Sequence, residues 1–167
     1  VELLEQSAVA SAAKLKFFRL AFGSAGGFGD KIPASEILSA INGIVGDRPI
    51  NLHWMVAADA VPKPAAKVLL NLALIMNDAL VRGGELSIGF EQQDDGMVEI
   101  VLHCEADRIL LDKEIEAILA EGEGAGETSS RTITAVLVQA LAVQHGGQVM
   151  LAREAANSLI IGAVLRP

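Results

Sequence analysis

The sequence predicts an α+β fold, in which one largely antiparallel sheet is covered by helices on one face. Four of the five segments with the alternating apolar pattern of strands form two hairpins, and helical segments separate the remaining segment and the two hairpins from one another. The first 22 residues contain neither glycine nor proline, and a glycine-rich stretch follows them. We therefore expect a bundle helix and its linker over residues 1–29, and an α/β sandwich domain over residues 30–167.

The N-terminal helix carries a seam of residues spaced alternately by four and three positions. Its members are Leu4, Ala8, Ser11, Leu15, Phe18 and Phe22. Helices with such a heptad seam pack against other helices in bundles. A second stripe of Leu3, Ala10 and Phe17 lies beside the seam, so the apolar face is wider than one partner helix uses. Two alternatives for this helix stay open. It is either a bundle helix of an oligomer or a core helix of the same domain.

The linker and the first elements of the domain follow in order. GSAGGFG, residues 23–29, has four glycines in seven residues and is typical of a flexible linker. A short helix is predicted over residues 35–46, with Pro33 near its start. In residues 49–56 one face holds Ile50, Leu52, Trp54 and Val56. This alternation predicts a half-buried strand.

The rest of the domain is predicted as one long helix, a hairpin, two further helices and a second hairpin. KVLLNLALIMNDALVRGGEL, residues 67–86, is apolar almost all round the helix. It is entered through Pro62 and Pro64 and ends at Gly83-Gly84. The later elements are strands over 85–92 and 96–106, helices over 112–120 and 129–145, and strands over 148–154 and 158–165.

Composition narrows the class of protein and its partners. The net charge of −8 argues against nucleic acid and anionic membranes as partners, because both bind basic surfaces. The single cysteine excludes an intrachain disulfide and a cysteine-cluster zinc site. The sequence has no signal-like segment and no apolar run of the ~18–20 residues that span a membrane. We therefore expect a cytoplasmic protein.

Few side chains indicate catalysis or metal binding. His53 and His103 fall on the polar faces of their strands and His145 ends a helix, so all three are expected at the surface. No histidine stands at ligand spacing from another, and we expect no metal site. Cys104 lies on the inward face of its strand and is expected to be a buried structural thiol.

Two other stretches are tempting as functional motifs. Ser129 and Ser130 stand at a predicted helix start, where hydroxyls cap exposed amides. GEGAG, residues 122–126, has the glycines of a phosphate-binding loop, but it follows a helix and has three glutamates in and around it. Three carboxylates repel a triphosphate, so a mobile acidic loop is the favoured interpretation.

The long helix resembles the nucleotide-site helix of histidine kinases, which reads approximately LLNLxxNAxxFxxxGG. Alignment of residues 68–72 and of Gly83-Gly84 puts Ile75 where the magnesium-binding asparagine of those kinases stands. Asn77 and Asp78 occupy other positions of the helix, since two residues correspond to a rotation of ~200°. We therefore expect that neither side chain replaces the missing asparagine.

The other nucleotide motifs of that superfamily are degenerate as well. Those kinases carry Asp-x-Gly-x-Gly after the central hairpin, whereas Asp107 has no glycines after it. The place of their glycine-rich lid is taken by SRTIT, residues 130–134. The resemblance therefore implies a histidine-kinase-like (Bergerat-like) sandwich that lacks ATP-binding motifs.

AAKLKFFRLAFGSAGG, residues 12–27, resembles a segment of the ChpT-like histidine phosphotransferases of alphaproteobacteria. In that family a (K/R)FFR(I/L)AFG pattern marks the second bundle helix and its exit. The resemblance spans essentially the whole chain. It implies a phosphorelay homodimer that passes phosphoryl groups between receiver-domain aspartates of a hybrid kinase and a response regulator. It implies no cofactor in this chain, because the magnesium would belong to the receiver.

The resemblance also implies roles for the N-terminal helix. The seam of a four-helix bundle dimer would contain Leu4, Ala8, Leu15, Phe18 and Phe22. Lys14, Lys16 and Arg19 are expected to meet an acidic receiver surface or, as the alternative, to form a solvated helix face.

No residue of this chain is expected to be catalytic. The family's phosphoacceptor stands in a His-Asp motif on the preceding bundle helix, and the three histidines of this chain lie in other elements. We therefore expect the acceptor upstream of Val1. Two other functions stay open, which are an ATP-binding histidine kinase or GHKL-type ATPase with unusual motifs, and a non-catalytic dimerisation or scaffold module.

Overall fold

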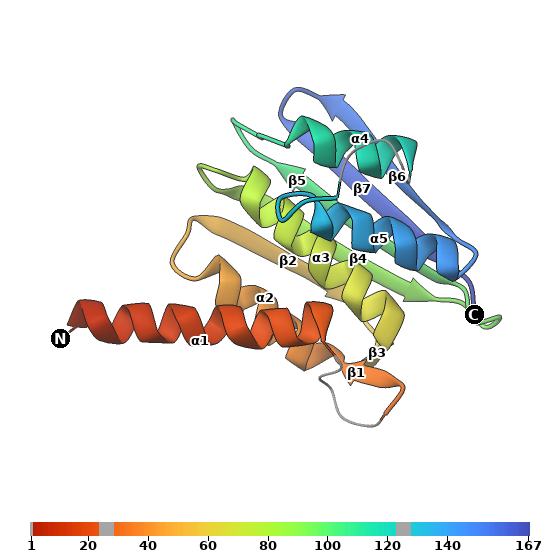
Figure 1. The fold of residues 1–167 in the computed structure, drawn as a ribbon, viewed down its shortest axis with the longest axis horizontal. Coiled ribbons are helices and arrows are strands. Elements are labelled where there is room, and N and C mark those ends of the chain that lie inside the picture. Colours follow the sequence, from red (N-terminus) through yellow and green to blue (C-terminus); the bar gives the residue numbers. More distant parts are fainter. Residues whose placement is uncertain (1, 24–28, 123–127) are drawn as a thin grey trace.

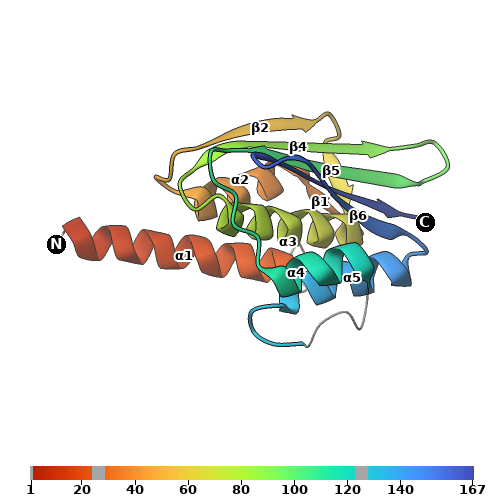
Figure 2. The same ribbon diagram turned by 90° about the horizontal axis from the view of Figure 1, so that it is seen from above.

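The structure is a computed structural model that describes residues 2–23, 29–122 and 128–167. A five-stranded sheet forms one layer, and helices form a second layer on one of its faces (Figures 1 and 2). Helix α1 (Glu2–Phe22) lies along the helical layer, and its N-terminal half projects beyond the domain (Figure 2). Most of the predicted linker, and most of the predicted acidic glycine loop, lie outside the described residues.

The elements agree in type and order with the prediction, with two short strands added. The further helices of the described ranges are α2 (Ala34–Val45), α3 (Lys63–Ala79), α4 (Lys113–Glu121) and α5 (Ile133–Gln144). The large sheet contains β2 (Ile50–Val56), β4 (Gly84–Gln92), β5 (Val98–Glu105), β6 (Gln148–Ala155) and β7 (Ser158–Leu165). The added strands, β1 (Lys31–Pro33) and β3 (Ala60–Pro62), pair with each other. Among the described residues, no helix has the length and hydropathy needed to cross a membrane.

The large sheet has the strand order β2-β4-β5-β7-β6. Every neighbouring pair is antiparallel except β2 and β4, which are parallel. A parallel pair needs a crossover connection, and here α3 provides it. The predicted fold class, an α+β fold with a mostly antiparallel sheet and helices on one face, is confirmed.

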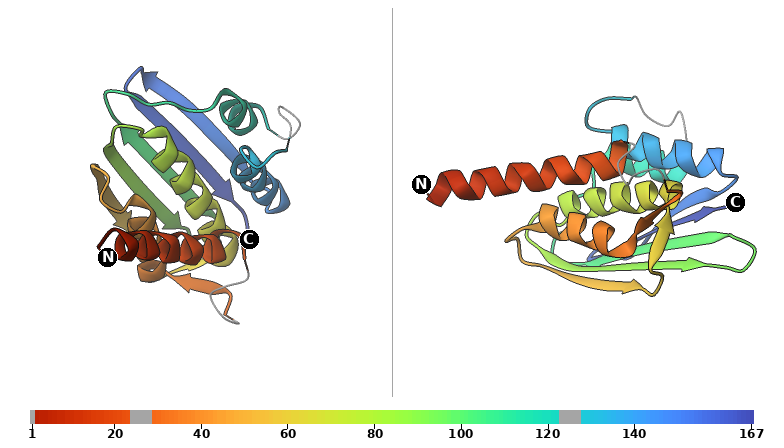
Figure 3. Two further views of the ribbon diagram at one scale, coloured as in Figure 1. Left: turned by 60° about the vertical axis from the view of Figure 1, so that its left-hand side comes forward. Right: turned by 90° about the horizontal axis from the view of Figure 1, so that it is seen from below.

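The core lies between the sheet and α3. Every second residue of β4, from Leu86 through Ile88 to Phe90, is buried on the inner face. Helix α3 crosses this face, and 12 of its 17 residues are buried. The sheet covers one side of α3, while α1, α2 and α5 pack on its other sides (Figure 3). This surrounding explains why the helix is apolar almost all round, since each of its faces has a neighbour.

Helix α1 divides between the core and the surface. Near its C-terminus Phe17, Leu20 and Ala21 are buried in the core of the domain. The side-chain amide of Asn71 on α3 donates hydrogen bonds to the carbonyl of Ala21 (3.2 Å) and to that of Lys67 (2.8 Å), which ties the end of α1 to α3. The last turns of α1 are therefore a core helix, as one alternative held, and the rest is open to solvent.

Arg48, in the loop between α2 and β2, closes the C-terminal end of α3. Its guanidinium donates to the carbonyl of Asn77 (2.8 Å), to the side-chain Oδ1 of Asn77 (2.9 Å) and to the carbonyl of Leu80. The last carbonyls of a helix have no partner within the helix, so an arginine at this position satisfies groups that burial would otherwise penalise.

Replacement of Arg48 by methionine is expected to lower the free energy of unfolding by about 1–3 kcal/mol, because half-buried acceptors lose a charged donor. Urea denaturation measures the change. Arg108→Met, at an exposed position of the loop after β5, serves as the control and should change stability by less than about 0.5 kcal/mol. Equal stability of the two variants would show that Arg48 does not hold the end of α3.

Cys104 is fully buried in β5, as predicted. Burial raises the pKa of its thiol to about 11, so below that pH the thiolate is scarce. Alkylation of the native protein by iodoacetamide at pH 8 should be at least roughly a hundredfold slower than alkylation of the urea-unfolded chain. Mass spectrometry over time measures both rates. Comparable rates would mean that the thiol is accessible and not a core residue.

Candidate functional site

A groove of ≈ 490 Å³ lies between the end of α1, α3 and the segments that start α4 and α5. Its lining includes Phe18, Phe22, Ile75, Asp78, Asp112 and Arg131. The groove thus runs beside the helix that resembles the nucleotide-site helix of histidine kinases. Its chemistry decides whether a nucleotide can bind there.

The α3 side of the groove includes the predicted apolar residue. Ile75 is 3% exposed and lines the groove at the position where the kinases carry their magnesium-binding asparagine. Asn77 turns away and bonds with Arg48, as the rotation argument predicted. The rotation of ~200° does not apply to Asp78, which lines the groove because a step of three residues returns to nearly the same helix face. That Asp78 does not replace the asparagine stays a prediction. Burial raises the pKa of Asp78, opposed by the charges of Arg48 and Lys14.

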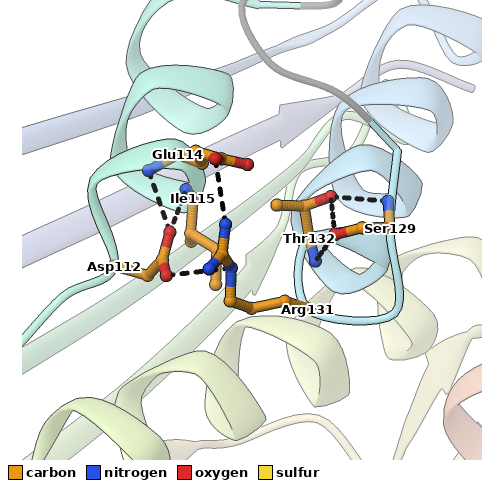
Figure 4. Close-up of polar contacts among 6 residues, drawn as sticks. All are labelled: Asp112, Glu114, Ile115, Ser129, Arg131 and Thr132. Carbon is orange, nitrogen blue, oxygen red and sulfur yellow. Dashed lines mark hydrogen bonds and ion pairs between the residues drawn. The ribbon is translucent and has the colours of Figure 1, made fainter.

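The opposite side of the groove is organised by one arginine and two carboxylates (Figure 4). Asp112 caps the N-terminus of α4, where its Oδ1 accepts from the backbone N–H groups of Glu114 (2.9 Å) and Ile115 (3.2 Å). Arg131 lies 3.1 Å from Asp112 and 2.9 Å from Glu114. These acidic neighbours raise the pKa of Arg131, and the largest cause is the hydrogen bond that its guanidinium donates to the Glu114 carboxylate. The guanidinium is thus held by carboxylates of the protein itself.

The turn before α5 corrects the predicted helix start. Helix α5 begins at Ile133, so Ser129 and Ser130 precede it and do not cap its amides. Instead, Ser129 and Thr132 bond reciprocally. The Ser129 N–H donates to Thr132 Oγ1 (3.0 Å), and the Thr132 N–H donates to Ser129 Oγ (3.3 Å) (Figure 4). In place of a glycine-rich lid, the chain forms a hydrogen-bonded turn.

The groove is poorly suited to a nucleotide. Asp78 and Asp112 present carboxylates where a triphosphate would need cations, and the nearby Arg131 is already paired. Asp107 lies elsewhere, in a depression of ≈ 360 Å³ that it shares with Arg82 and Arg108. Apolar walls with a few carboxylates instead fit the side chains of a protein surface.

The family-model comparison identifies the domain. The model of the histidine phosphotransferase C-terminal domain matches residues 34–157. The chain belongs to this family. Within it, the protein phosphotransferase ChpT of Brucella abortus (strain 2308) is 35% identical over 92 residues, which are 55% of this chain and 44% of that protein. The chain therefore spans less than half the length of this curated relative. The predicted resemblance to ChpT-like histidine phosphotransferases is confirmed.

Solved structures agree on the fold of this phosphotransferase domain. A structure described as a bacterial phosphotransferase superposes with a TM-score of 0.83 at 23% identity, covering 97% of this chain and 77% of that one. The mycobacterial sensor histidine kinase MprB gives a TM-score of 0.57 at 17% identity, over 81% and 97% of the two chains. A blue-light activated histidine kinase domain from Erythrobacter litoralis gives 0.59 at 14% identity, over 95% and 73%. At these identities the likeness establishes a histidine-kinase-like fold alone.

The three histidines of the phosphotransferase domain lie on separate elements outside α1. His53 on β2 pairs with Glu85 at 2.6 Å and is half exposed. His103 on β5 contacts Ser158 Oγ at 2.9 Å, and His145 ends α5. Among the described residues, no three metal-ligating side chains gather into a group that could hold an ion.

The residues predicted for bundle and partner contacts are exposed on α1. Leu4 is 76% exposed, Leu15 60% and Phe18 42%. Ala8, Phe22 and the cationic residues Lys14, Lys16 and Arg19 are also exposed. Because Phe18 and Phe22 line the groove too, the seam and the groove form one continuous surface. The bundle contact itself stays a prediction.

Sequence reasoning missed the pairing of Arg131 with Asp112 and Glu114. The N-cap signal of Asp112, directly before the helical pattern of residues 113–121, was available. The sequence carried no signal for the position of Arg131, because that position depends on how α5 packs beside α4.

Addition of Mg-ATP at millimolar concentration is expected to shift the Tm of the domain by less than about 1 °C. A ligand present at 100 times its Kd would add about 2.7 kcal/mol, which for a domain of this size is roughly 5 °C or more. Differential scanning fluorimetry measures the shift, with an active histidine kinase catalytic domain as the positive control. A shift of several degrees would mean that the groove binds nucleotide.

Proposed function

We propose that this domain belongs to a phosphorelay histidine phosphotransferase that passes phosphoryl groups between receiver-domain aspartates of a hybrid kinase and a response regulator. The observation that carries the proposal is the family match over residues 34–157, on a kinase-like fold whose nucleotide position holds Ile75 and two carboxylates. A kinase-like body without an ATP site can still hold and dock a histidine that other proteins phosphorylate. A cytoplasmic location is part of the proposal.

The acceptor histidine is proposed to lie N-terminal to α1. Support comes from the positions of His53, His103 and His145, which belong to the sheet and to α5 and not to a bundle helix. In the transfer step, an imidazole nitrogen forms a P–N bond while the P–O bond to the receiver's aspartate breaks. The return step reverses this exchange. Positioning and the receiver's own magnesium supply most of the catalysis.

The exposed face of α1 is proposed as the dimer and docking surface. A homodimeric four-helix bundle would bury the seam of Leu4, Ala8, Leu15, Phe18 and Phe22. Exposed leucines and phenylalanines in a row are costly in water, which supports a covered seam. Lys14, Lys16 and Arg19 on the same helix would meet acidic receiver surface.

Phosphoryl transfer from a ³²P-labelled receiver tests the proposal on the full-length protein. We expect label on the phosphotransferase within minutes, and its loss when the histidine of the preceding helix is replaced by alanine. Alanine replacements of His53, His103 and His145 should leave labelling unchanged. Label retained without the upstream histidine, or lost with one of these three, would contradict the proposed acceptor.

The same assay tests the cationic residues of α1. Charge reversal of Lys16 and Arg19 to glutamate should slow transfer roughly tenfold at low salt and less at high salt, because steering by exposed charges is screened. Lys113→Glu, an exposed position on α4, is the matched control. Equal rates for the double variant and the control would exclude a docking role for the two residues.

A further inference from the structure

The outer face of the five-stranded sheet is left uncovered by the described chain. All the helices of the described ranges lie on the other face (Figures 2 and 3). The strand register places one residue from each strand in a row across the middle of this face, in the order Met55, Gly89, Val101, Gly162 and Met150. Met55 is 61% exposed, Val101 47% and Met150 56%. We call these five residues the outer row.

The two glycines of the outer row are not required by the fold. A Cβ at Gly89 would have its nearest contact at 3.8 Å, and one at Gly162 at 3.7 Å, which are ordinary van der Waals distances. Neither residue has a positive φ. The contrast is Gly147, where a Cβ would stand 1.6 Å from the carbonyl oxygen of Val164.

Glycine inside a strand weakens it, and such a glycine often marks a place where another group approaches closely. Here the two glycines interrupt the side-chain cover on each side of Val101, with a methionine at each end of the row. We call these two positions without side chains the glycine hollows. Methionine adapts its shape to a partner and is over-represented on binding surfaces. The outer row therefore combines adaptable apolar side chains with two positions at which a partner's side chain can approach the backbone.

The face that carries the outer row is acidic. Glu91 and Glu99 lie two residues from the outer row along β4 and β5, on one side of it. Glu85 and Glu105 lie four residues from the row on the other side. Asn51 and His53 bond with Glu85 at 3.0 Å and 2.6 Å.

Two of these glutamates have histidine neighbours on the same face, since His53 lies 2.6 Å from Glu85 and His103 lies 3.6 Å from Glu105. No lysine or arginine of the five strands pairs with any of the four glutamates. The one residue of that type in these strands, Arg153, bonds to Glu116 of α4 on the helical side. Nucleic acid and anionic membranes are repelled by such a surface, whereas a cationic protein segment is attracted.

We propose that the outer row binds an amphipathic helix of a partner protein, with apolar side chains in the two glycine hollows and lysine or arginine side chains beside the four glutamates. Neighbouring strands are ~4.8 Å apart, so the hollows on β4 and β7, two strands apart, are separated by about 10 Å. Helix residues seven positions apart are separated by about 10.5 Å. A helix that lies across the strands can therefore fill both hollows at once.

This surface is separate from the one proposed for phosphoryl transfer. The seam of α1 and the groove lie in the helical layer, and the outer row lies on the opposite face of the sheet (Figure 2). A partner on the outer row therefore does not obstruct a receiver or a bundle partner on the helices. The domain would hold two proteins at the same time.

A synthetic helical peptide tests the proposal. The probe is a 15-residue fluorescein-labelled peptide with leucines at i, i+4, i+7 and i+11 and lysines on both flanks. A second peptide of the same composition distributes its leucines around the helix. Fluorescence anisotropy with the complete domain is expected to give at least tenfold tighter binding of the first peptide. Equal binding of the two peptides, or no binding, overturns the proposal.

Two variants locate the binding site. Gly89→Val with Gly162→Val fills both hollows and raises strand propensity, and should weaken binding at least tenfold. Glu91→Gln with Glu99→Gln leaves the backbone untouched and should weaken binding several-fold and flatten its salt dependence. Leu110→Ser, an exposed apolar position on the groove side, is the control and should bind as the parent does. Parent-like binding by both double variants, or weakened binding by the control alone, overturns the assignment.

Discussion

The burial of α3 on most of its sides is the constraint on which the rest of the structure depends. This helix makes the crossover that lets β2 and β4 lie parallel, and its apolar side chains fill the space between the sheet and the other helices. Each fully buried leucine contributes roughly 1.5–3 kcal/mol. Most of the helix is shielded from solvent, and its two buried asparagines make structural hydrogen bonds. The side chain of Asn71 donates a hydrogen bond to the carbonyl of Ala21 at the end of α1, and the side chain of Asn77 accepts one from the guanidinium of Arg48.

The same constraint shapes the groove. The kinase-like fold keeps a depression beside α3, and the side chains that reach it decide what can enter. Ile75 gives the groove an apolar wall, while Asp78 and Asp112 bring carboxylates that disfavour a triphosphate. The guanidinium of Arg131 is paired with the carboxylates of Asp112 and Glu114, so its charge is already balanced within the protein and does not favour a phosphate group. The lining of the groove therefore supports the prediction that this domain does not bind a nucleotide.

The two faces of the domain differ in ways that suit different partners. The helical face combines an apolar seam and scattered cations of α1 with the groove. The outer sheet face combines the apolar outer row with glutamates. The net charge of −8 is therefore unevenly distributed, with cations on α1 and a sheet face whose charged side chains are acidic. Under the two proposals, one face takes part in phosphoryl transfer and the other recruits a cationic partner.

The sequence by itself determined the order of the main elements, the inward faces of β2 and β5 and the presence of Ile75 where the kinases carry an asparagine, because these follow from local periodicity and motif spacing. It could not reveal the β1–β3 pair, whose three-residue strands are too short to show alternation. It misplaced the start of α5 and the side on which Asp78 lies. It also could not divide α1 between core and surface, since Phe17 and Phe18 are neighbours in sequence and equally apolar. Only the tertiary structure decided these points, because they depend on which surface happens to pack against a distant element.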